Sequence, residues 1–154
     1  MTIVTQGQKC LFGEIVGGEM RLNPFGEIIK EEWLLTAEIR HEITLDAFVI
    51  MPNHFHAIVL IYNDVLRATG RSPLPKYGKS LYPHGPTPKS LGALVAGFKS
   101  SATKRINILR NAPGVPLWQR NYYEHIIRNE EDYERIFNYI ATNPTHWAED
   151  EENR

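Results

Sequence analysis

Alternation of hydrophobic and polar residues predicts several β strands. Successive side chains of a strand point to opposite faces, and runs rich in β-branched and aromatic residues are typical of strands. Such runs occupy residues 2–5, 10–16, 43–51, 54–62 and 117–128. Pro52 and Asn53 separate the run at 43–51 from the run at 54–62, which predicts a hairpin with its turn between Met51 and His54.

Other segments repeat their apolar residues at i, i+3 and i+4, which is typical of amphipathic helices. These helices are predicted over residues 25–39, over residues 90–109, and from a cap at Asn129 to a stop at Pro144. Residues 63–89 contain five prolines and three glycines and have no periodicity, which predicts a long mobile loop.

The predicted order of elements favours an α+β fold. Hairpins imply an antiparallel sheet, and the helices need an apolar surface to cover, so we expect an antiparallel sheet with helices packed on one face. A ferredoxin-like sandwich is the natural candidate. At 154 residues, with 42% hydrophobic and 23% charged residues, the chain is predicted to form one domain spanning residues 1–154.

Composition excludes several classes of protein. A single cysteine, Cys10, rules out an internal disulfide framework and a multi-cysteine zinc site. We find no apolar run long enough to cross a bilayer and no secretion signal, so we expect a cytoplasmic protein without a membrane partner.

Charge is unevenly distributed along the chain. The formal net charge of −1 argues against a general polyanion binder, yet residues 89–128 contain seven basic residues and one acidic residue. Residues 129–154 contain two basic and eight acidic residues. The basic window is compatible with local binding of nucleic acid, and equally with an ordinary solvated helix face.

The sharpest chemical feature is the pair His54 and His56. Alternation along a strand places both imidazoles on one face and Phe55 on the other, and two neutral imidazoles can share one divalent metal. The position after Pro52-Asn53 predicts that the pair lies at the beginning of a strand, near the sheet edge, within reach of a substrate. A histidine pair also occurs for packing reasons alone, so a further ligand is needed.

The last predicted helix offers that ligand. Its buried stripe is predicted to contain Tyr133, Ile136, Phe137 and Ile140, which leaves Tyr139 on the flank. Asn143 lies one turn further along the same flank. Considered one at a time, Tyr139 could be an ordinary surface tyrosine, and Asn143 could simply end the helix before Pro144.

Together these residues suit phosphodiester cleavage. A tyrosine that attacks a phosphodiester becomes a covalent phosphotyrosine, and this conserves the bond energy for a later rejoining step. A metal at His54 and His56 would polarise the scissile phosphate.

Four segments resemble the REP-associated tyrosine transposases of the HUH single-tyrosine superfamily. They are residues 49–58 (VIMPNHFHAI), 98–104 (FKSSATK), 118–128 (WQRNYYEHIIR) and 139–144 (YIATNP), in the family's order. The resemblance covers nearly the whole chain, from about residue 5. It implies a ferredoxin-like sandwich, His54 and His56 as metal ligands, Tyr139 as the nucleophile, and Asn143 as a further ligand. It also implies Mg²⁺ or Mn²⁺ as cofactor and cleavage of single-stranded DNA near imperfect hairpins.

Residues that contact DNA are expected in and beside the basic window. Lysine and arginine suit phosphates, and aromatic rings suit unpaired bases. The expected contacts are Lys99, Lys104, Arg105, Trp118, Arg120 and Tyr122. The resemblance leaves open whether the active site forms within one chain or across a homodimer.

Three functions remain open on the sequence. The leading hypothesis is a metal-dependent DNA endonuclease and strand transferase that acts through Tyr139. A domesticated hairpin-binding protein with little or no turnover is the alternative from a different class. A plain metal phosphodiesterase, in which His54 and His56 activate water, is the third.

Overall fold

The computed structural model describes residues 1–62, 89–150 and 152–153. Apart from Lys89, the loop predicted for residues 63–89 lies outside these residues. The elements, in chain order, are β1 (Thr2–Val4), a 3-10 turn η1 (Gln6–Gln8), β2 (Gly13–Val16), β3 (Glu19–Leu22), α1 (Pro24–Ile39), β4 (Ile43–Ile50), β5 (His54–Ile61), α2 (Leu91–Leu109), α3 (Glu130–Thr142) and a 3-10 segment η3 (Asn143–Glu149).

Within the described residues, the central sheet has the order β1-β5-β4 and is antiparallel throughout. The β4–β5 hairpin predicted from residues 43–62 is confirmed, with an irregularity of register between Leu45 and Phe48. A separate two-stranded sheet joins β2 to β3 through the turn at Gly17 and Gly18, both of which have positive φ. The predicted α+β fold class is confirmed.

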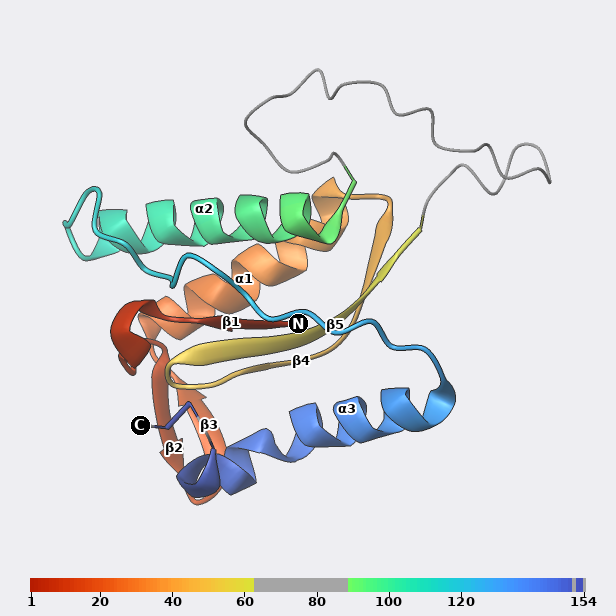
Figure 1. Ribbon diagram of the computed structural model, residues 1–154. Helices are drawn as coiled ribbons and strands as arrows, with labels where there is room; N and C mark the ends of the chain where they lie inside the picture. Colours follow the sequence, from red (N-terminus) through yellow and green to blue (C-terminus); the bar gives the residue numbers. More distant parts are fainter. Residues whose placement is uncertain (63–88, 151, 154) are drawn as a thin grey trace.

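Two helical layers enclose the sheet. Helices α1 and α2 pack together against one face, but α3 lies across the opposite face (Figure 1), so the expectation that the helices cover a single face is wrong. On the α1 and α2 side, Phe55 from β5 packs edge-on against Trp33 and also contacts Phe98, with ring centroids 4.9 and 5.4 Å apart. This side holds the main hydrophobic core, and the histidines of β5 lie on the other side, which faces α3.

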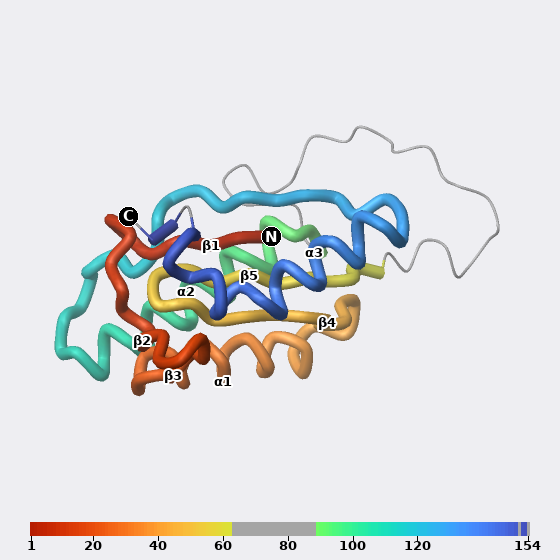
Figure 2. Tube along the Cα trace, turned by 90° about the horizontal axis from the view of Figure 1, so that it is seen from below, coloured from red at the N-terminus to blue at the C-terminus, as the bar shows by residue number. Residues whose placement is uncertain are grey.

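The strand predicted for residues 117–128 is wrong. This segment runs beside β1 (Figure 2) but forms only two isolated bridges there, from Thr2 to Tyr123 and from Thr5 to Trp118. The ammonium group of Lys99 explains why the pairing with β1 is not continuous. It donates hydrogen bonds to the backbone carbonyls of residues 119, 120 and 121. Those carbonyls are therefore already engaged by a side chain from α2.

The end of the chain also differs from the prediction. Helix α3 ends at Thr142, before Pro144 as the sequence predicts, but the backbone then continues as the unpredicted 3-10 segment η3 to Glu149. Proline is compatible with the first turn of a helix because its missing N–H has no partner there. The continuation carries Asp150 back towards the sheet.

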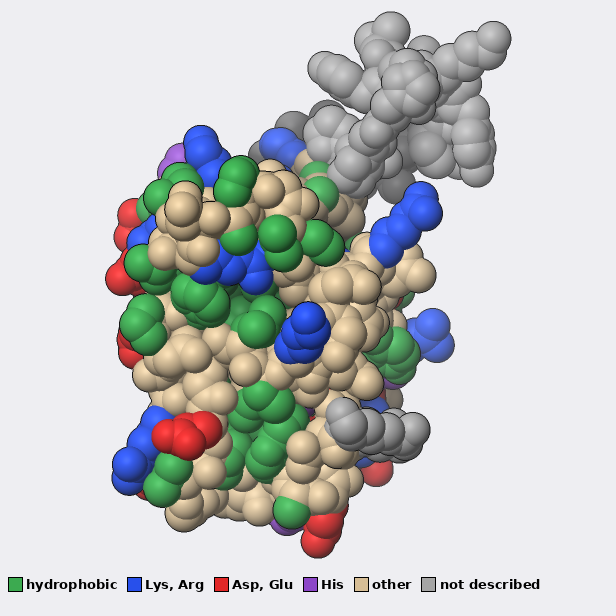
Figure 3. Space-filling view, turned by 90° about the vertical axis from the view of Figure 1, so that its left-hand side faces the viewer, with side chains coloured by type: hydrophobic (Ala, Val, Ile, Leu, Met, Phe, Trp, Pro, Cys, Tyr) green, Lys and Arg blue, Asp and Glu red, His purple; other side chains and the backbone are tan. Residues whose placement is uncertain are grey.

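Charged side chains are mixed over the face of the molecule nearest to β2, β3 and the turn η1. Basic, acidic and hydrophobic groups are interspersed there (Figure 3). No helix of the described residues is long and apolar enough to cross a membrane.

Candidate functional site

Strand β5 positions the two histidines. His54 and His56 point towards α3, whereas Phe55 points into the core, as strand alternation predicts. The expectation that the pair lies near the sheet edge is wrong, because β5 is hydrogen-bonded to β1 on one side and to β4 on the other. Both histidines are buried, with exposed fractions of 0% and 7%.

The two imidazoles face each other with one nitrogen of each ring engaged. Their ring centroids are 4.5 Å apart. Nδ1 of His54 lies 2.8 Å from Oδ1 of Asn53, and Nδ1 of His56 lies 2.8 Å from Oγ1 of Thr2. Both Nε2 atoms are buried and have no hydrogen-bond partner among the described residues. Because unpartnered buried polar atoms are costly, this pair is a candidate for ligand binding.

Two further polar groups converge on the histidines. Asn143 is 2% exposed; its Nδ2 donates to Oδ2 of Asp150 at 2.9 Å, and its Oδ1 has no partner in the described part of the chain. Ligand atoms of His54, His56 and Asp150 all lie within 4.8 Å of one another. The sequence predicts Asn143 as a ligand but not Asp150. In the sequence, the only feature that could have indicated Asp150 is that this acidic residue follows shortly after Asn143.

This donor set fits a divalent cation. Two imidazole nitrogens, an amide oxygen and a carboxylate oxygen are groups that Mn²⁺ and Mg²⁺ accept in proteins. Burial, and after it the neighbouring His54, lower the pKa of His56 to about 3. Burial also lowers the pKa of His54, although the negative charges of Asp150 and Glu152 act to raise it. Both rings are therefore neutral near pH 7, which metal ligation requires.

Tyr139 lies beside this group in the same chain. Its ring and that of His56 are in edge contact, with centroids 5.2 Å apart and planes at 72°. The Tyr139 side chain is 51% exposed, in agreement with its predicted place on the helix flank. Tyr139, His56, Asn143 and Asp150 line one cleft of about 990 Å³. The phenol can therefore be reached from solvent while the histidines beside it stay buried.

The buried stripe predicted for α3 is only partly correct. Ile140 is buried, but Phe137 is 40% exposed. Among the described elements, α3 has no second helix beside it on its face of the sheet, so part of its apolar stripe remains uncovered (Figure 1). The phenol of Tyr133 is held instead by a hydrogen bond to Oδ2 of Asp46 at 2.8 Å.

The expected aromatic DNA contacts differ in accessibility. Tyr122 lines the cleft, half-buried, and donates to Glu124 at 3.2 Å. Trp118 is 7% exposed and packs between Phe12 and Phe98 in the core. Burial leaves its ring no free face for a base, so the prediction of a base contact at Trp118 does not hold. Tyr123, beside it, is 66% exposed in the cleft wall.

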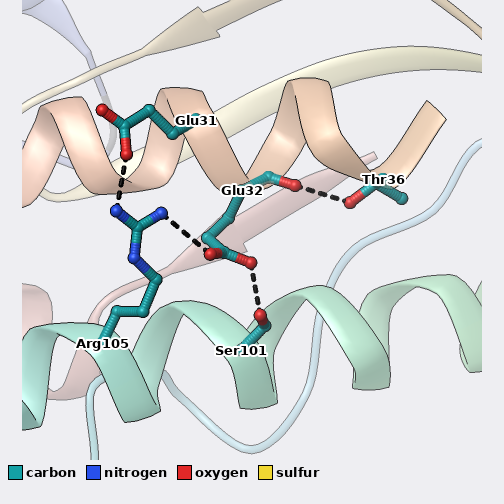
Figure 4. A network of polar contacts seen from close by, with 5 residues as sticks. All are labelled: Glu31, Glu32, Thr36, Ser101 and Arg105. Atoms are coloured by element: carbon teal, nitrogen blue, oxygen red, sulfur yellow. Dashed lines mark hydrogen bonds and ion pairs between the residues drawn. The ribbon is translucent and has the colours of Figure 1, made fainter. Parts of the chain in front are cut away.

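The expected basic DNA contacts are spread over the molecule. Arg120 is exposed in the segment that borders the cleft, and Lys104 is exposed on α2, across the sheet from the histidines. Lys99 joins α2 to residues 119–121, as described above. Arg105 bonds to Glu31 and to the buried Glu32, which also accepts from Ser101 (Figure 4). The structure thus ties Lys99 and Arg105 to groups of the protein itself.

Comparisons with known proteins agree with this fold. No protein-family model matches the chain. A Haemophilus influenzae protein whose function is uncharacterized is 37% identical over 152 residues, which covers 98% of this chain and 82% of the relative. A solved REP-associated tyrosine transposase, bound to a REP hairpin, superposes with a TM-score of 0.59 at 17% identity, over 95% of this chain. This chain spans 65% of the length of that transposase chain. The chain therefore belongs to the family of the Haemophilus influenzae protein and has the fold of a REP-associated tyrosine transposase.

Proposed function

We propose that this protein cleaves and rejoins single-stranded DNA near hairpins, with Tyr139 as the nucleophile and a divalent metal, Mg²⁺ or Mn²⁺, as cofactor. The observation that carries the proposal is the contact between Tyr139 and His56 beside the buried, unpartnered Nε2 atoms of both histidines. All of these groups come from one chain, so the proposed site does not need a second subunit.

The residues divide the chemistry between them. His54, His56, Asn143 and Asp150 would hold the cation, which when bound polarises the phosphate and offsets charge on its oxygens. The Tyr139 phenol gives its proton to water, which later returns a proton to the leaving 3′ oxygen, and the phenolate oxygen attacks phosphorus. One phosphorus–oxygen bond forms to tyrosine as the bond to the DNA 3′ oxygen breaks, which leaves a 5′-phosphotyrosine and a free 3′-OH. Rejoining is the reverse displacement by a 3′-OH.

Part of the cleft wall carries side chains that suit a single DNA strand. Its wall offers the aromatic side chains of Tyr122 and Tyr123 and the guanidinium of Arg135. Aromatic rings stack on bases of any sequence, and cationic groups track the backbone. We retain Arg120 and Lys104 as proposed phosphate contacts outside the cleft. The solved structural neighbour is bound to a REP hairpin, which supports hairpin-bearing DNA as the substrate class. We propose that the protein acts on this DNA in the cytoplasm, associated with the nucleoid when it is bound to DNA.

A covalent-capture experiment tests the proposal. Labelled single strands that carry imperfect hairpins are incubated with the protein and Mn²⁺ or Mg²⁺, and the products are separated under denaturing conditions. We expect a protein–DNA adduct that Tyr139→Phe abolishes. Tyr62→Phe is the matched control, because Tyr62 is 53% exposed, much like Tyr139, but lies at the end of β5 outside the cleft. Adduct formation by Tyr139→Phe at the normal rate would disprove the assignment.

The same experiment separates the other two functions. A free 5′-phosphate product without an adduct would indicate a metal phosphodiesterase that uses water. Hairpin binding that is insensitive to EDTA, with no cleavage of any strand, would indicate a binding protein without turnover.

A further inference from the structure

Asn53 connects three distant parts of the chain at the candidate metal centre. It is 1% exposed and lies in the β4–β5 turn, directly before His54. Its Oδ1 lies 2.8 Å from Nδ1 of His54. Its Nδ2 donates to the backbone carbonyls of Gln8 at 3.2 Å and of Glu152 at 2.6 Å. All of the side chain's polar atoms are therefore engaged.

These contacts determine where the proton of His54 lies. The carbonyls of Gln8 and Glu152 only accept hydrogen bonds, so the amide nitrogen of Asn53 must face them and its oxygen must face His54. That oxygen also only accepts, so Nδ1 of His54 carries the hydrogen. A neutral imidazole has one N–H, and Nε2 is therefore left with a lone pair. This is the same Nε2 that is buried without a partner.

His56 has no equivalent constraint. Its Nδ1 lies 2.8 Å from the hydroxyl of Thr2, and a hydroxyl both donates and accepts. The Thr2 contact is compatible with either neutral tautomer of His56. Of these two Nδ1 contacts, only the one from Asn53 fixes a tautomer.

Asn53 also positions the segment that carries Asp150. The carbonyl of Glu152 accepts from Asn53, and its carboxylate accepts from Gln8 at 2.9 Å. The backbone N–H of Glu152 donates to Oδ1 of Asp150 at 2.8 Å. One amide side chain thus orients an imidazole ligand and docks the turn that presents the carboxylate.

We infer that Asn53 is a positioning residue that presets the metal centre: it fixes the Nδ1–H tautomer of His54 and docks the Asp150 turn before the cation arrives. This rests on the metal centre of the proposed function and adds the residue that organises it. Partners that orient metal-binding histidines in this way typically contribute 10- to 100-fold in metal affinity.

Two variants separate the two roles. Asn53→Leu removes both, so we expect His54 to lose its preference for the Nδ1–H tautomer and Mn²⁺ affinity to fall about 10- to 100-fold. Asn53→Asp keeps an acceptor for Nδ1–H but places a carboxylate against the carbonyls of Gln8 and Glu152. We expect this variant to keep the tautomer while the amide of Glu152 exchanges with solvent faster.

Imidazole ¹⁵N NMR of the metal-free protein reads the tautomer, Mn²⁺ titration followed by electron paramagnetic resonance reads the affinity, and amide exchange reads the docked turn. Asn107→Leu is the matched control, because Asn107 is also buried and also donates to a backbone carbonyl, but on α2. It should leave all three readouts unchanged.

An unchanged tautomer and unchanged Mn²⁺ affinity in Asn53→Leu would overturn the inference. If Asn53→Leu does not fold, loss of the tautomer in Asn53→Asp, or an unchanged exchange rate at Glu152, would overturn it instead. None of these measurements involves DNA. The inference can therefore hold for a protein that forms no DNA adduct, and fail for one that does.

Discussion

The hydroxyl of Tyr133 donates to Oδ2 of Asp46 at 2.8 Å and so joins the first turns of α3 to the irregular part of β4. Tyr139 lies farther along the same helix, against His56. The hydrogen bond from Tyr133 to Asp46 therefore helps to set the position of Tyr139 relative to the histidines, although it involves none of these residues.

Loss of this contact should slow DNA cleavage without weakening the metal centre. We expect Tyr133→Phe to lower the rate of adduct formation severalfold, since even a small displacement of a reacting group is costly. The free energy of unfolding should fall only slightly, because the lost hydrogen bond lies near solvent. Single-turnover kinetics and Mn²⁺ titration check this, with Tyr62→Phe as the control. Equal losses of rate and Mn²⁺ affinity would contradict a purely positional role.

Asp150 should contribute to metal affinity through its charge. Asp150→Asn keeps the shape of the side chain but removes the anionic ligand, so we expect Mn²⁺ to bind roughly tenfold more weakly or worse. Glu149→Gln is the control, because Glu149 is a neighbouring carboxylate that lines the cleft but is not among the clustered ligands. Calorimetric titration of both variants measures the difference. Equal affinities would exclude Asp150 as a ligand.

Acid should destabilise the metal-free protein through the histidine pair. Burial lowers the pKa of His56 to about 3 and also lowers that of His54, whereas histidines of an unfolded chain titrate near 6.5. Below that pH the unfolded chain binds protons that the folded chain does not. The free energy of unfolding is therefore greatest above pH 6.5 and falls as the pH drops towards 3.

The slope should approach about 1.4 kcal/mol per pH unit for each such histidine. Urea unfolding in the presence of EDTA between pH 6.5 and 5 measures this slope. In that interval ordinary carboxyl groups remain ionised and do not contribute to it. We expect His56→Gln to show a shallower slope than the wild type. A wild-type stability that stays constant over this interval would contradict the argument.

Lys99 and Lys104 should behave differently although both lie on α2. Lys99 is partly buried and holds the carbonyls of residues 119–121, so Lys99→Met should cost about 1–3 kcal/mol of stability and loosen the cleft wall. Lys104→Met should leave stability within about 0.5 kcal/mol. If Lys104 contacts a phosphate, that variant should reduce the salt dependence of DNA binding by about one counterion. Denaturant unfolding and salt-titrated binding of both variants test this, and equal stability losses would contradict it.

Local patterns were sufficient to predict the parts of the site but not the whole. A period of two along β5 predicts that His54 and His56 share a face, and a spacing of four predicts that Tyr139 and Asn143 share a helix flank. Nothing in either pattern brings the helix to the strand. That convergence depends on long-range contacts, such as the bond from Tyr133 to Asp46.

Errors in the sequence predictions have the same origin. Residues 117–128 have the composition of a strand, but a lysine from α2 engages three of their carbonyls. The role of Asp150 depends on a turn docked by Asn53 and Gln8, which lie far away in the sequence. Neither interaction can be recognised from the local pattern of hydrophobic and polar residues.

The ligand atoms of the candidate metal centre come from β5 and from the region that follows α3. An unfolded chain keeps His54 near His56, but bringing Asn143 and Asp150 to them closes a long loop at an entropic cost. A cation that occupies the centre should therefore bind the native state far more tightly than the unfolded chain. By mass action it would raise stability by about 2.7 kcal/mol at one hundred times its dissociation constant. The melting temperature, and with it the survival of the protein in a cell, would then depend on cation supply.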